Sequence, residues 1–147
     1  MALQIEYTDE EKAKLLAVRA AKAGRADERN ASASTAYKKA LFELCDGDED
    51  KLIVTTMPTQ FGGAIIHRLP TPEAWAVISK KIVSALVSDG KKANAADAIA
   101  SLVENGKLLV HPSISELQAM RDELPDLYSE IHNVMDARCS HGQSAGK

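Results

Sequence analysis

The first 45 residues carry apolar and small side chains at helical spacing around a polar middle. Thr8 and Glu11 have the spacing of a capping box, which predicts that a helix begins near Asp9. Gly24 and the Asn/Ser-rich stretch 29–34 disfavour helix, glycine by up to about 1 kcal/mol relative to alanine. We predict two helices forming a hairpin. Since the apolar phase is kept across the polar gap, the alternative is one helix over 9–45 that projects the N-terminus as a partner-binding arm. The positions in phase are Leu16, Ala20, Ala23, Tyr37, Leu41 and Leu44.

The next segment has the pattern of a β-hairpin. Residues 52–57 are rich in β-branched side chains and predict a strand, 58–60 a turn, and 62–69 a second strand. A lone two-stranded hairpin is only marginally stable in water. We therefore expect a third strand, either from residues 3–7 or from residues 107–110.

Helices with apolar stripes are predicted for the rest of the chain. Thr71 is a good N-cap and Pro72 suits the first helical position, so a helix is expected over 72–88. A helix containing Ile99 and another capped by Ser113 should follow, and a last helix should end near Cys139. The stripes define the expected core: Trp75, Ile78, Ile82, Leu86, Ile99, Leu102, Leu117 and Leu124.

These elements predict an α+β fold that is mainly α-helical, with five to six helices and a small antiparallel β-hairpin. The chain of 147 residues is long enough for one core. Its hydrophobic content is ordinary, but only 4% of all residues are aromatic, which favours closely packed helices. We divide it into a helical region 1–47, a hairpin with a helical core 48–139, and a polar, disordered tail 140–147.

Charge and hydropathy narrow the classes of partner. The formal net charge is -3, with acidic and basic residues interspersed, which argues against a nucleic-acid surface. No apolar run approaches the roughly 18 residues that span a bilayer, and the first residues lack the features of a secretory signal. We expect no nucleic acid, no membrane and a cytoplasmic location, with both cysteines reduced.

The residues capable of chemistry form no recognisable catalytic or metal motif. His132, Cys139 and His141 are close in sequence, but structural zinc sites use four tightly spaced ligands. Neither cysteine has a nucleophile motif around it. His67 is interpreted as an exposed polar residue on the outer face of the hairpin, and His111 as a packing or hydrogen-bonding residue. We therefore expect no catalytic residue, no cofactor and no metal, and a protein that is not an enzyme.

Two short motifs resemble a known family. They are Arg68-Leu69-Pro70-Thr71 with Trp75, and the later Leu-Leu-Val-His-Pro-Ser of residues 108–113 with Leu117 and Leu124-Pro125. Residues 62–136 thereby resemble the tail assembly chaperones encoded among the tail genes of tailed bacteriophages. His111 stands where that family has an aromatic residue, and the Ala-rich N-terminal region has no counterpart in it.

The resemblance implies a non-enzymatic chaperone that binds the tape-measure protein or tail-tube subunits in the host cytoplasm during tail morphogenesis. Alternatives are a structural virion component of the tail or connector, and a small helical regulatory or host-directed interaction protein. Association into a homo-oligomer is also left open. Candidate contact residues are Leu16, Tyr37, Leu41, Met120 and Met135.

Overall fold

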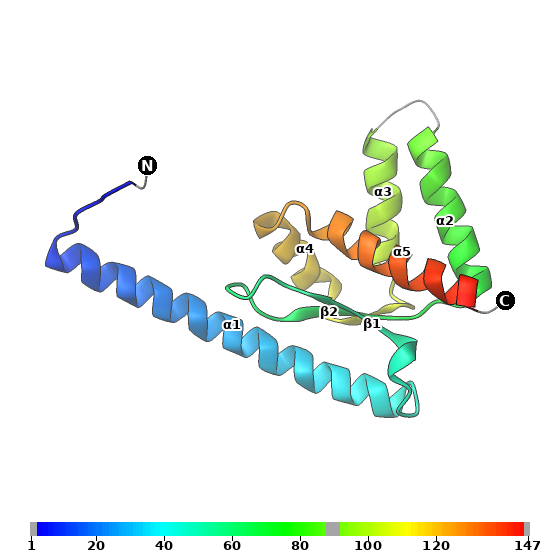
Figure 1. Cartoon of the computed structure of the whole chain (residues 1–147), viewed down its shortest axis with the longest axis horizontal. Coiled ribbons are helices and arrows are strands. Elements are labelled where there is room, and N and C mark those ends of the chain that lie inside the picture. The colour runs from blue at the N-terminus through cyan, green and yellow to red at the C-terminus, as the bar shows by residue number, and fades with distance from the viewer. Residues whose placement is uncertain (1–2, 88–91, 146–147) are drawn as a thin grey trace.

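The computed structural model describes residues 3–87 and 92–145, without the side chains of 92–94 and 141–145, and shows a mainly helical α+β fold (Figure 1). The helices are α1 (Asp9–Glu43), α2 (Pro72–Val87), α3 (Lys92–Val103), α4 (Ile114–Glu123) and α5 (Leu127–Ala145). The strands are β1 (Leu52–Thr56), β2 (Ala64–Arg68) and β3 (Leu109–His111), and a short 3-10 turn, Glu49–Lys51, precedes β1. The predicted fold class is confirmed, with five α-helices in the described residues.

The sheet is antiparallel with the order β1-β2-β3. The predicted hairpin is confirmed, since Leu52 pairs with Arg68 and Thr56 with Ala64. The third strand comes from the candidate segment 107–110, because β3 pairs with β2: His111 lies opposite Ile66, and Leu109 lies opposite His67. Residues 3–7 form no strand within the described chain, since α1 carries them away from the sheet (Figure 1).

Helices cover both faces of the sheet, α1 on one face and α2 to α5 on the other (Figure 1). Successive side chains of a strand point to opposite faces. Ile53 and Ile65 therefore join the larger core cluster, whereas Leu52 and Ile66 pack under α1 with Ala40, Leu41 and Cys45. The other buried members of the larger cluster are Met57, Trp75, Ile82, Leu102, Val103, Leu117, Met120, Leu127, Tyr128, Ile131, Met135 and Cys139.

The predicted core is correct except at Leu86. Leu86 is 58% exposed, because the last turn of α2 lies beyond the sheet and α5, where α3 is its neighbour (Figure 1). Ile78, Ile99 and Leu124 are partly buried and pack against the core cluster. The other four predicted core residues are buried: Trp75, Ile82, Leu102 and Leu117.

The prediction of two N-terminal helices is wrong, because α1 is a single helix of 35 residues. At 1.5 Å per residue it is about 50 Å long. Ala26, Ala33 and Ala40, each seven residues apart, are buried and let the helix lie close to the sheet. Packing of this face offsets the roughly 1 kcal/mol that Gly24 costs in the helix interior.

One of the expected boundaries differs from the structure. Helix α5 continues to Ala145, so residues 140–145 are helical where a disordered tail was expected from Ser140. Residues 146 and 147 lie outside the described chain. The expected boundary at residue 47 lies between the end of α1 and the start of β1, and α1 shares buried side chains with the sheet.

Candidate functional site

Helix α1 crosses the turn between β1 and β2 at a point of very close approach. Gly62 and Gly63 have φ values of 78° and 85°, a left-handed conformation that favours glycine. A Cβ atom on Gly62 would lie 2.4 Å from the Ala26 carbonyl oxygen and 2.6 Å from its Cα. Only glycine therefore lets the turn touch the backbone of α1.

Two polar residues of α1 hold the turn in place. Arg29 Nη1 donates a hydrogen bond of 2.9 Å to the Phe61 carbonyl, and its guanidinium stacks 3.9 Å from the centre of the Phe61 ring. The Gly63 N–H donates to Asn30 Oδ1 over 2.7 Å. Residues that the sequence suggested as helix breakers thus attach the helix to the hairpin.

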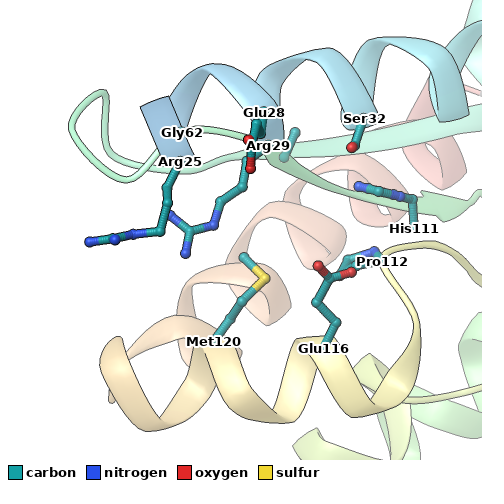
Figure 2. Close-up of a pocket in the computed structure, with 11 residues that line it drawn as sticks. Arg25, Glu28, Arg29, Ser32, Gly62, His111, Pro112, Glu116 and Met120 are labelled. Carbon is teal, nitrogen blue, oxygen red and sulfur yellow. The ribbon is translucent and has the colours of Figure 1, made fainter. Parts of the chain in front are cut away.

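A cleft of about 310 Å³ lies between α1, this turn and the start of α4. Figure 2 shows Arg29 extending from α1 toward Met120 of α4 and Arg25 turned away from Met120, while Glu116 lies near Pro112. The lining mixes both charges and has no single sign. Its residues are Arg25, Glu28, Arg29, Ser32, Gly62, Gly63, Ala64, His111, Pro112, Glu116 and Met120.

A larger groove of about 570 Å³ adjoins the cleft, because Arg25 and Arg29 line both. This groove has three basic side chains and one acidic one around apolar surface from Phe61 and Leu124. We call it the basic groove; its lining is Lys22, Arg25, Arg29, Pro58, Gln60, Phe61, Glu123 and Leu124.

A third hollow, of about 270 Å³, lies where α1 meets β1 and β2. Its floor is formed by Val54, Ala64 and Ile66 of the sheet, and Tyr37 and Lys38 of α1 stand beside it. Val54 is 39% exposed there. The hollow brings apolar sheet surface into contact with solvent.

The N-terminal half of α1 projects beyond the body of the protein (Figure 1). Every residue from Leu3 to Arg25 is exposed except Leu15, which is half-buried. Leu16 is 64% exposed and Val18 44%. We call residues 3–25 the arm.

The structure separates the predicted contact residues into two groups. Leu16 lies on the arm and Tyr37 lines the third hollow, whereas Met120 borders the cleft but is buried, with 9% of its surface exposed. Leu41 and Met135 are wrong as contact residues: Leu41 is buried against the sheet, and Met135 is fully buried in the larger core cluster. Three residues of the site were not predicted from the sequence, Arg25, Arg29 and Phe61, although the Gly62-Gly63 pair was an available signal.

His67 is less accessible than the sequence suggested, whereas His111 is half-buried. The interpretation of His67 as an exposed residue is wrong, because it is fully buried and its Nε2 donates to the Val103 carbonyl over 2.9 Å. Burial lowers the pKa of His67, and the bond to Val103 opposes this in part. Burial likewise lowers the pKa of the half-buried His111, and Glu116 opposes it.

Acid should destabilise the fold through these histidines. An unfolded histidine titrates near a pKa of about 6.5, whereas His67 and His111 bind protons only at lower pH when folded. The stabilising contribution of the two neutral histidines to the free energy of unfolding is therefore present above about pH 6.5. It is lost as the pH falls toward the folded pKa values, by up to about 1.4 kcal/mol per pH unit for each proton. Urea unfolding between pH 7.5 and 5 measures this slope, which His67→Gln and His111→Gln should each reduce. A flat profile would contradict the argument.

The cysteines are not arranged as nucleophiles. Both are buried and free. Burial, with Asp136 adding to it, raises the pKa of Cys139 to about 11, so its thiol is protonated at neutral pH. Among the described side chains, no group of three His, Cys, Asp or Glu residues could hold a metal ion. The side chain of His141 lies outside them.

None of the helices in the described ranges 3–87 and 92–145 has the length and apolar character to cross a bilayer. No family model, curated protein or solved structure matches the chain. The architecture itself therefore defines the class of the protein: a small α+β protein with a projecting helical arm and open grooves where the arm joins the body.

Proposed function

We propose that this protein is a non-enzymatic tail assembly chaperone of a tailed bacteriophage, which binds tape-measure or tail-tube subunits in the host cytoplasm. The proposal is carried by the arm, a helical surface that contacts no other element over most of its length in the described chain. The resemblance of residues 62–136 to tail assembly chaperones supports the phage context.

The exposed surface suits the binding of a helical client. Leu16 and Val18 on the arm offer apolar contacts, and the partly buried Phe61 lines the basic groove beside it. A client helix can lay its apolar stripe against such surface, which removes about 25 cal/mol of unfavourable hydration per Å² buried. Shielding that stripe would keep the client from aggregating before assembly.

Co-expression with the tape-measure protein of the same phage tests the proposal. The wild-type chain is expected to raise the soluble amount of the client and to co-purify with it. A double variant, Leu16→Glu with Val18→Glu, should reduce co-purification because both side chains are exposed on the arm. Val77→Glu with Val83→Glu changes two exposed residues of α2 and serves as the control. Unchanged solubility and no complex with either tape-measure or tail-tube protein would refute the proposal.

The extended residues before α1 favour a second candidate, a structural virion component. Leu3, Ile5 and Tyr7 alternate with polar residues and are all exposed, a pattern suited to adding a strand to a neighbouring subunit. Mass spectrometry of purified particles separates the two functions. A chaperone should be absent from mature virions, whereas a structural component should be present in fixed copy number.

A further inference from the structure

Positive charge is concentrated on residues 12–25 of the arm, in a chain that is acidic overall. Residues 12–25 contain five basic side chains and no acidic one, although the whole protein has a net charge of -3. All five are exposed. The basic residues are Lys12, Lys14, Arg19, Lys22 and Arg25.

Part of this set, Lys12, Arg19 and Lys22, continues the face by which α1 packs on the sheet. Ala26, Ala33 and Ala40 mark that face in the packed half. Seven residues make almost two helical turns, so Arg19 and Lys12 occupy the same face in the projecting half. One face of α1 is therefore alanine where it is covered and basic where it is uncovered.

The basic groove extends this face onto the body of the protein. Lys22, Arg25 and Arg29 stand along its α1 side, and Phe61 and Leu124 supply apolar lining. Figure 2 shows Arg25 and Arg29 reaching from α1 into the space above α4. Cationic side chains thus border the apolar lining of the groove.

We propose that the basic face of the arm and the basic groove together bind an amphipathic helix whose apolar stripe is flanked by Asp and Glu. The inference rests on the proposed function and specifies the client segment: carboxylates would pair with the cationic border while apolar side chains cover Phe61 and Leu124. Residues 12–25 span about 20 Å, which fits a helix of roughly four turns.

Charge on the neighbouring surface favours a protein over a nucleic acid. Glu123 lines the basic groove, and Glu28 and Glu116 line the adjoining cleft. The first turn of α1 is acidic. A phosphate backbone following the cations would meet these carboxylates, whereas an amphipathic helix presents its carboxylates only along two edges.

The full-length protein can be titrated with three fluorescent probes. One is a 21-residue helical peptide with a leucine stripe flanked by Glu, the second has Lys in place of each Glu, and the third is a 20-base-pair DNA duplex. Fluorescence anisotropy should show the Glu peptide binding about tenfold or more tightly than the other two, with an affinity that falls as NaCl is raised.

A charge-reversal variant tests the location of the site. The variant combines Arg19→Glu, Lys22→Glu and Arg25→Glu, and its affinity for the Glu peptide should be about tenfold lower or more. The control reverses three exposed lysines elsewhere, Lys80, Lys81 and Lys107, and should keep the affinity within about twofold. Circular dichroism and urea midpoints verify that both variants fold.

Three results would overturn the inference: equal affinity for the Glu and Lys peptides, tighter binding of DNA, or undiminished affinity of the charge-reversal variant for the Glu peptide. Its failure is distinguishable from that of the proposed function. Co-purification of the tape-measure protein with the charge-reversal variant at wild-type level would overturn the inference and leave the proposed function standing. Charge-dependent binding of the Glu peptide without any phage client would leave the inference standing and overturn the proposed function.

Discussion

Replacing Trp75 with alanine is expected to lower the free energy of unfolding by about 3–5 kcal/mol. Trp75 is 3% exposed and belongs to the larger core cluster with Ile82, Leu102 and Ile131. The cluster joins α2, α3 and α5 to the sheet, so the lost side chain leaves a cavity where these elements meet. Part of the cost is lost transfer free energy and part is the unfilled volume.

Urea unfolding followed by circular dichroism measures this cost, since the variant has no tryptophan to report by fluorescence. Val77→Ala is the matched control, because Val77 lies two residues away on the same helix and is 57% exposed. Its effect should stay within about 0.5 kcal/mol. A change below about 1 kcal/mol for Trp75→Ala would show that the tryptophan does not anchor the core.

Local signals in the sequence were sufficient for most element starts and for the sheet. Thr8 and Glu11 form the predicted capping box, with bonds of 3.2 and 2.8 Å, and Ser113 accepts from the Glu116 N–H as expected. Such caps depend on residues three apart, so they can be recognised from spacing alone. The paired strands likewise follow from two β-branched runs separated by a short turn.

Contacts between distant residues decided what the sequence left open. Arg29 and Asn30 are stabilised in one continuous helix by Phe61 and Gly63, more than 30 residues away. Periodicity identifies an apolar face but not what covers it, which is why Leu86 is exposed. His67 is buried because both faces of the sheet are covered, and alternation along one strand does not show this.

The candidate site was only partly predictable. The run of basic residues over 12–25 is visible in the sequence, and Leu16 was expected on a partner-binding surface. The cleft and the basic groove exist because α1 crosses the hairpin turn beside α4. That crossing depends on a glycine whose role appears only in three dimensions.

Gly62→Ala is expected to destabilise the protein by about 2–5 kcal/mol. The left-handed backbone costs a residue with a Cβ about 1–2 kcal/mol. The new methyl group would also lie within 3 Å of three backbone atoms of Ala26, and such overpacking typically costs about 1–3 kcal/mol. Since backbone cannot rotate aside as a side chain can, relief of the clash requires α1 to move off the turn.

Hydrogen exchange can distinguish displacement of α1 from general loosening. Amides of α1 from Ala26 onward should lose protection in Gly62→Ala before those of β2 and α5, because the clash acts where α1 meets the turn. If Gly62→Ala kept the stability and the amide protection of the wild type, the close approach of α1 and the turn would be contradicted.

Gly24→Ala is the matched control, with the opposite expected sign. Apart from the adjacent residues and the nearby backbone of α1, no atom lies within 4 Å of a Cβ built on Gly24, and this residue is inside α1 without a left-handed φ. Alanine should therefore stabilise the helix by about 0.5–1 kcal/mol. Both variants add one methyl group to a glycine and have a similar effect on the unfolded chain. A difference in sign between their urea midpoints can then arise only from the folded state, where Gly62 touches α1 and Gly24 faces solvent.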